Sequence, residues 1–124
     1  MDQPSPSEMS VLKALWTQSP LGAREIHERA GSSRDWSYST TRTLIARMVD
    51  KGLIERGDAH GLAVFHPRAT KAQVLSMMVR SFSAQVFDLD EPLPASAFAS
   101  SPLLDPDDVA ELEKLLAEPA GETS

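Results

Sequence analysis

One segment in the middle of the chain, residues 36–54, constrains the fold most strongly. Side chains suited to burial recur there at the three- and four-residue spacing of one α-helical face. They are Thr41, Leu44, Ile45, Met48 and Val49. Ser37 is a residue type that caps helix N-termini, and Gly52 is suited to end a helix. Because Leu53 and Ile54 begin an extended segment, the pattern predicts a helix that runs directly into a strand.

The opposite face of this helix carries hydroxyl and guanidinium groups and no acid before Asp50. Such groups suit the phosphate oxygens and base edges of a DNA major groove. We expect Arg42 and Thr43 to face the bases, whereas Arg47 holds the backbone. The predicted DNA-binding residues, two of them from the segment that follows the helix, are Ser37, Ser39, Thr40, Arg42, Thr43, Arg47, Arg56 and His60. The same face could also be only a solvated surface, with Arg42 paired to an acid.

Two further helices are predicted before this one. Residues 5–8 read Ser-Pro-Ser-Glu, which is a capping box with proline at the first helical position, and they begin a helix over residues 6–17. Gly22, with Glu25 three residues later, begins a second short helix that we expect to end at Gly31.

Two strand-like runs follow the third helix, at residues 53–56 and 62–66, with turn residues at both ends of the connection 57–61. Three helices followed by a small hairpin form a winged helix-turn-helix. The sequence therefore predicts a mainly α-helical fold with a β-hairpin wing, in which residues 1–69 are the DNA-binding domain.

The rest of the chain is predicted to be a helical dimerisation region, residues 70–118, with a disordered tail at 119–124. A wide apolar stripe over residues 70–87 has no core left to cover in the first domain, which indicates a partner subunit. We expect a linker over 88–102, rich in Pro, Ala and Ser, and a last helix capped by Asp105. The predicted dimer contacts are Leu75, Met78, Val79, Phe82, Val86, Val109, Leu112 and Leu116.

The net charge of −6 opposes DNA binding unless the acids lie elsewhere. Residues 1–70 hold nine Lys and Arg against eight Asp and Glu, whereas residues 71–124 hold three against ten. The acidic part must therefore point away from DNA, and binding depends on the position of the basic groups rather than on their number.

Several classes of protein are not expected. The chain has no cysteine, and His27, His60 and His66 lack metal-ligand spacing, so neither a metal nor another cofactor is predicted. No apolar run is long enough to insert into a membrane, and the first residues do not resemble a secretory signal. We expect a cytoplasmic protein. No catalytic grouping or phosphate loop is present, so an enzyme is not predicted.

Three motifs together resemble one known family. They are Glu8…Val11-Leu12-Lys13…Leu15-Trp16, Pro20-Leu21-Gly22-Ala23-Arg24-Glu25-Ile26, and Trp36-Ser37…Thr40-Thr41-Arg42-Thr43-Leu44…Arg47-Met48…Lys51-Gly52-Leu53-Ile54. From Ser7 to Leu116 the chain resembles the penicillinase-repressor family of bacterial winged-helix repressors, which includes the methicillin-resistance and copper-responsive repressors. It differs in having Gly22 where the family often has Thr, and a less basic wing at residues 58–60.

The resemblance implies a homodimeric repressor on inverted-repeat operators with TACA/TGTA-type half-sites. In one branch a membrane-bound sensor protease triggers cleavage of an Asn–Phe bond, which aligns with Ala97-Phe98 here; the phenylalanine matches and the asparagine does not. The copper branch uses C-terminal cysteines, so copper sensing is not expected. Because a dimer links two half-sites, the second contact becomes intramolecular, with a gain of roughly 10²–10⁴. Loss of the dimer should therefore release the operator.

Two alternatives stay open. One is a ligand-responsive winged-helix regulator of another family, with a pocket between the DNA-binding and dimer helices. The other is a winged helix used only for protein–protein contact, which the low net charge allows.

Overall fold

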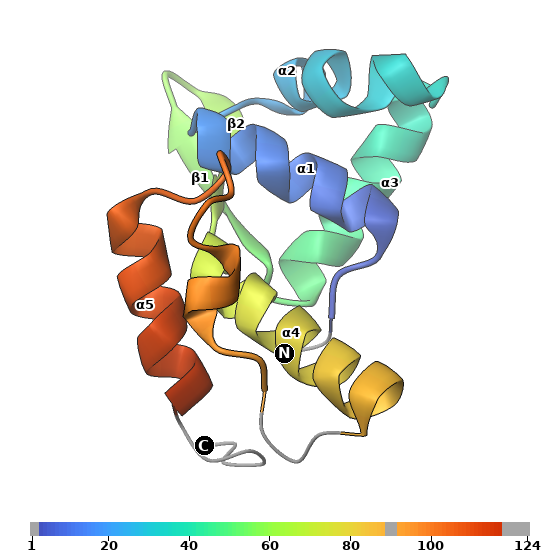
Figure 1. Cartoon of the computed structure of the whole chain (residues 1–124). Coiled ribbons are helices and arrows are strands. Elements are labelled where there is room, and N and C mark those ends of the chain that lie inside the picture. Colours follow the sequence, from blue (N-terminus) through green and yellow to red (C-terminus); the bar gives the residue numbers. More distant parts are fainter. Residues whose placement is uncertain (1–2, 89–91, 118–124) are drawn as a thin grey trace. The chain divides into compact units, whose positions relative to one another are not determined.

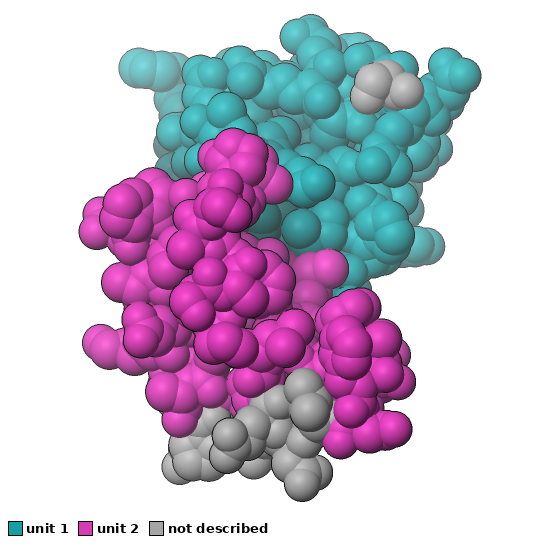
Figure 2. Space-filling view, viewed as in Figure 1, with its two compact units in different colours: residues 1–70 teal, residues 71–124 magenta. Residues whose placement is uncertain are grey.

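The computed structural model describes residues 3–88 and 92–117 (Figure 1). The chain divides into two compact units, residues 1–70 and 71–124, which Figure 2 colours separately. The tail predicted at residues 119–124 lies outside the described residues.

The first unit is a winged helix-turn-helix, as predicted. Its helices are α1 (Pro6–Thr17), α2 (Ala23–Ile26), a π-type turn η1 (His27–Gly31), a 3₁₀ turn η2 (Ser32–Arg34) and α3 (Tyr38–Asp50). An antiparallel hairpin follows, made of β1 (Ile54–Ala59) and β2 (Leu62–Pro67). The core of this unit lies between the helices and the hairpin and includes Val11, Leu12, Leu15, Ile26, Ile45, Met48, Leu53 and Ile54.

The capping box of α1 forms as the sequence predicts. The Glu8 amide donates to Ser5 Oγ (3.2 Å), and the Ser5 amide donates to Glu8 Oε1 (2.8 Å). Lys51, which caps the C-terminus of α3, also donates to both Glu8 carboxylate oxygens, at 2.9 and 3.0 Å. Burial of the carboxylate opposes its ionisation, but the Ser5 amide and the Lys51 ammonium outweigh this and lower the pKa of Glu8 below its usual 4.5.

We expect Glu8→Gln to reduce stability at neutral pH but not in acid. Because the folded-state pKa is lowered, the charged Glu8 stabilises the fold above pH 4.5, and this contribution is lost as the pH falls through the folded-state pKa. Denaturant unfolding from pH 7 down to pH 3 measures the difference in unfolding free energy between wild type and variant. That difference should shrink in acid; a difference independent of pH contradicts the assignment.

The π-type turn η1, which continues α2, ends at Gly31, as predicted for the second helix. The 3₁₀ turn η2 follows, and the chain turns at Asp35, whose φ is 59°. Gly31 also lies where the turn packs against α3. A Cβ at this position would meet His27 Nδ1 and Thr41 Oγ1 at 2.7 Å each. The glycine is therefore required for close packing rather than for helix termination.

Gly31→Ala is expected to destabilise the first unit by about 1–3 kcal/mol, the usual cost of overpacking. The added methyl group must displace His27 or Thr41, whose side chains lie 2.7 Å apart. Gly57→Ala is the matched control, because a Cβ there meets its nearest neighbour at 3.5 Å, an ordinary contact. Equal unfolding free energies for the two variants would contradict this account of Gly31.

The hairpin is longer and its turn tighter than predicted. Strand β1 begins at Ile54 and continues to Ala59, paired with Leu62, so most of the predicted 57–61 connection is strand. Only His60 and Gly61 form the turn, with φ of 54° and 81°. Positive φ at both residues of a two-residue turn matches the twist of the flanking strands.

The second unit contains α4 (Lys71–Phe87), a 3₁₀ turn η3 (Ala95–Phe98) and α5 (Pro106–Ala117). Asp105 caps α5 as predicted, accepting from the Asp108 amide at 2.8 Å. Contrary to expectation, the apolar stripe on α4 packs against other elements of its own unit. It contributes to an apolar cluster within this unit, made of Ala72, Val79, Ala95, Leu112 and Leu116.

Polar contacts also join α4 to the last helix. Lys71 Nζ contacts Asp108 Oδ2 at 3.3 Å near one end, and Arg80 Nη2 donates to the carbonyls of Leu115 (2.8 Å) and Leu116 (3.2 Å) near the other. In residues 3–88 and 92–117, no helix combines the length and the apolar character needed to cross a membrane.

Candidate nucleic-acid interface

The N-terminus of α3 is fixed by its cap. Ser37 Oγ accepts from the Thr40 amide at 3.1 Å and lies 3.0 Å from Thr40 Oγ1. The Thr40 amide is therefore already used, which leaves the amides of Tyr38 and Ser39 without a partner inside the helix. The phosphate site predicted at Ser39 and Thr40 thus reduces to their hydroxyls and the two free amides.

The two faces of α3 separate as the periodicity predicts. Thr41, Ile45 and Met48 are buried, and Leu44 and Val49 are half-buried. The predicted DNA-binding residues within the helix are all exposed: Ser39, Thr40, Arg42, Thr43 and Arg47. The acid Asp50 is exposed at the end of the same helix.

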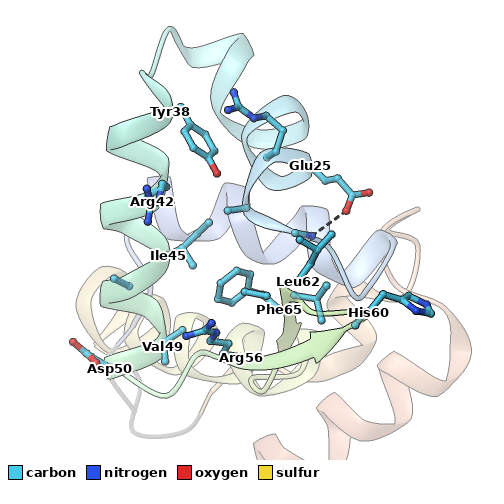
Figure 3. Close-up of a pocket in the computed structure, with 17 residues that line it drawn as sticks. Glu25, Tyr38, Arg42, Ile45, Val49, Asp50, Arg56, His60, Leu62 and Phe65 are labelled. Carbon is cyan, nitrogen blue, oxygen red and sulfur yellow. Dashed lines mark hydrogen bonds between the residues drawn. The ribbon is translucent and has the colours of Figure 1, made fainter.

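A groove of about 860 Å³ lies between α3, the start of α2 and the hairpin. Figure 3 shows Tyr38, Arg42, Ile45 and Val49 in order along α3, with Leu62 and Phe65 of the hairpin across from them. The predicted DNA-binding residues that line it are Arg42, Arg56 and His60. The groove therefore has an apolar floor and basic groups from both the helix and the hairpin.

The other predicted residues of α3 lie on its opposite flank, and the cap residue Ser37 lines neither flank. A hollow of about 770 Å³ there is lined by Ser39, Thr40, Thr43 and Arg47, together with residues at the start of α1. Thr43 Oγ1 donates to the Ser39 carbonyl at 3.1 Å, so this hydroxyl remains able to accept from a ligand. The predicted set is thus divided between two flanks of one helix.

Two residues that were not predicted from the sequence, Arg24 and Tyr38, also line the groove. The Arg24 guanidinium lies 3.9 Å from the centre of the Tyr38 ring, and that of Arg42 lies 6.0 Å from the same centre. Arg24 follows the Gly22 cap by two residues, so its place at the start of the helix before α3 was a signal that could have identified it.

The groove carries a formal excess of one positive charge. Arg24, Arg42 and Arg56 line it, against the carboxylates of Glu25 and Asp50. Glu25 is turned toward the backbone, since its Oε1 accepts from the Gly22 amide at 3.0 Å (Figure 3). Within the part of the chain that the structure describes, no three His, Asp or Glu side chains are placed to hold a metal ion.

Comparison with known proteins identifies the family of this chain. The model of the family described as Penicillinase repressor matches residues 4–118. The chain belongs to the penicillinase repressor family.

Its curated relatives in this family are repressors and regulators of resistance. The chain is 26% identical to the methicillin resistance regulatory protein MecI of Mammaliicoccus sciuri, over 90% of this chain and 91% of the relative. It is 22% identical to the penicillinase repressor of Bacillus licheniformis, over 94% and 91%. The MecI protein of Staphylococcus aureus (strain N315) is 25% identical over 90% and 91%. This penicillinase repressor family member is thus a transcriptional repressor, and the family implies DNA binding.

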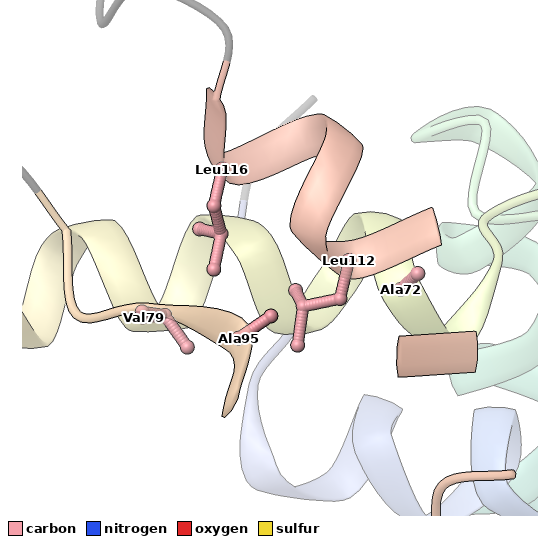
Figure 4. Close-up of a cluster of buried hydrophobic side chains, with 5 residues drawn as sticks. All are labelled: Ala72, Val79, Ala95, Leu112 and Leu116. Atoms are coloured by element: carbon pink, nitrogen blue, oxygen red, sulfur yellow. The ribbon is translucent and has the colours of Figure 1, made fainter. Parts of the chain in front are cut away.

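The residues predicted to join two copies of this repressor fall into two groups. Val79, Leu112 and Leu116 are buried within their own unit (Figure 4), and Leu75 and Val109 pack against the same cluster. Of the predicted residues, Phe82 (51% exposed) and Val86 (56%) are exposed toward the end of α4, beside Phe87 (53%), which was not predicted; Leu103 (65%) is also exposed in this unit. Met78 is half-buried.

The predicted cleavage bond lies in ordered structure. Ala97 is exposed in η3, and its amide donates to the Pro94 carbonyl at 3.0 Å. Phe98 is half-buried and packs against the apolar cluster of this unit, while its carbonyl accepts from the Ser101 amide at 3.0 Å. The bond between them is therefore part of a folded turn.

Proposed function

We propose that this repressor binds an inverted-repeat operator as a homodimer, with α3 in the major groove of each half-site. The observation that supports this most directly is the convergence of Arg24, Arg42 and Arg56 on one groove beside the exposed face of α3. Positive side chains gathered along the edge of a helix match the charge of a phosphate backbone.

The division of polar groups between two flanks of α3 fits insertion between two DNA strands. Arg42, one turn into the helix, is placed to read a guanine edge, since arginine binds O6 and N7 with two donors. Arg47 and the Thr40 hydroxyl face the other flank, where a phosphate accepts from the Arg47 guanidinium. Thr43 lies on this flank and not beside Arg42, as its predicted place among the base-facing residues required, and its hydroxyl already donates to the Ser39 carbonyl. In the major groove a helix is bounded by a backbone on each side, so both flanks gain partners.

The dimer is proposed to form through the exposed apolar end of α4, where Phe82, Val86 and Phe87 are each more than half exposed. Loss of the dimer releases the operator, because a single DNA-binding unit binds one half-site only weakly. Cleavage between Ala97 and Phe98 by a membrane-bound sensor protease is one route. It would detach Phe98 and α5 from α4 and so uncover the apolar cluster between them.

The test begins by sequencing DNA fragments pulled down with the protein. An inverted repeat from these fragments is then compared with scrambled DNA by fluorescence anisotropy. We expect tighter binding to the repeat, with two chains bound per duplex. Failure to bind any DNA at low salt would overturn the proposal and favour a role in protein–protein contact. Operator binding that responds to a small molecule would favour a ligand-responsive regulator.

Arg47→Ala is expected to weaken binding to operator and scrambled DNA by similar factors. A phosphate contact carries no sequence information, and losing it should lower the slope of log K against log salt by about one per half-site. Lys114→Ala removes the same charge from α5, outside the DNA-binding unit, and serves as the control. A change in base preference on loss of Arg47 would contradict a phosphate role.

A further inference from the structure

The first residue of α3, Tyr38, lies at the centre of a group of side chains that sequence spacing does not reveal. Its ring is half-buried and is approached by Arg24 at 3.9 Å and by Arg42 at 6.0 Å. The His27 ring meets it edge-to-face, with the centroids 5.7 Å apart and the planes at 77°. Side chains of α2, η1 and α3 therefore share one aromatic ring.

This ring is held from the core side. His27 Nδ1 lies 2.7 Å from the hydroxyl of Thr41, which is fully buried. Gly31 leaves the space that this pair occupies, since a Cβ there would come within 2.7 Å of both partners. A chain of contacts thus runs from the buried face of α3 through His27 to the Tyr38 ring.

A fixed aromatic ring can order a guanidinium without using its hydrogen bonds. The ring attracts the cation, while the in-plane N–H groups of a stacked arginine stay free for a carboxylate or phosphate. At 3.9 Å, Arg24 is in stacking contact, whereas Arg42 at 6.0 Å is at the outer limit of this attraction. The ring also keeps two like charges near each other on one surface.

We propose that Tyr38 is a positioning residue for DNA recognition: its ring holds Arg24 ready for a backbone phosphate and restricts Arg42 to directions that reach the base edges. The inference rests on the proposed DNA binding. It adds that selectivity depends on a side chain which need not touch a base.

Substitutions at Tyr38 and at Arg24 should have different effects on DNA binding. Tyr38→Leu removes the ring and is expected to reduce the ratio of operator to scrambled affinity by about 3- to 30-fold. Tyr38→Phe keeps the ring and should leave the ratio of operator to scrambled affinity at its wild-type value. Arg24→Gln should weaken both kinds of DNA alike and lower the salt slope by about one per half-site. Since Arg24 is exposed, this variant tests the arrangement even if Tyr38→Leu does not fold.

Anisotropy titrations against operator and scrambled DNA at several salt concentrations measure all three variants, with thermal unfolding to establish folding. Unchanged selectivity in a folded Tyr38→Leu variant, or loss of selectivity in Tyr38→Phe, overturns the positioning role. An unchanged salt slope in Arg24→Gln also overturns it. If wild type itself fails to prefer the operator, the proposed function fails instead, so the two failures are distinguishable.

Discussion

Arg42→Ala is expected to remove most of the preference for operator over scrambled DNA. A bidentate contact between arginine and guanine contributes roughly 1–3 kcal/mol of discrimination, and a dimer makes the contact twice, so the expected loss is roughly 2–6 kcal/mol. Arg42 is exposed one turn into α3 and lines the groove beside the hairpin, so its loss should leave the fold and the dimer intact. Anisotropy titrations against both DNAs measure the effect.

Arg29→Ala is the matched control for Arg42. This arginine is also exposed in the first unit, but its Nη2 donates to Gln18 Oε1 at 2.7 Å, and it lines neither flank of α3. It therefore reports the general effect of one lost positive charge. If half-site selectivity survives in Arg42→Ala, the reading face of α3 has been assigned wrongly.

Phe82→Asp is expected to convert the protein into a monomer with two folded units. Phe82 is 51% exposed, and its ring meets Phe87 edge-to-face at 5.5 Å, so the pair presents an apolar surface rather than filling the core. A carboxylate buried in a dimer interface at this position would be unpaired and strongly unfavourable. Operator affinity should then fall by roughly 10²–10⁴, the gain provided by linking two half-sites.

Light scattering after size-exclusion chromatography measures the mass, and circular dichroism measures the helix content. Ala84→Asp, also exposed on α4, introduces the same charge two residues away, on a different side of the helix, and should remain dimeric. A Phe82→Asp protein that stays dimeric and binds operator normally would place the interface elsewhere.

Local patterns predicted the helices of the first unit well, because caps and periodicity depend on neighbouring residues. Ser5 with Glu8 and Ser37 with Thr40 form the predicted caps. The hairpin turn was predicted too long, since strand pairing continues through Gly57 as far as Ala59. Backbone pairing across a hairpin is a tertiary contact that residue types indicate only weakly.

The remaining features depend on tertiary contacts, which the sequence alone does not indicate. The apolar stripe of α4 was correctly seen, but a stripe does not state whether its own chain or a second copy covers it. Val79 is covered within its own unit, whereas Phe82 is left exposed. The approach of Arg24 to Tyr38 joins residues far apart in sequence through the close packing at Gly31, and no spacing rule predicts it.

The shortness of the hairpin turn bears on the base pairs that flank each half-site of the proposed operator. With only two residues, the turn offers one imidazole, from His60, and no side chain from Gly61, and the next residue, Leu62, is apolar and 71% exposed. A hairpin tip with so few side chains makes little contact with the bases of the adjoining minor groove. In the proposed complex, promoters that share the central repeat but differ in their flanking base pairs should therefore be silenced to a similar degree.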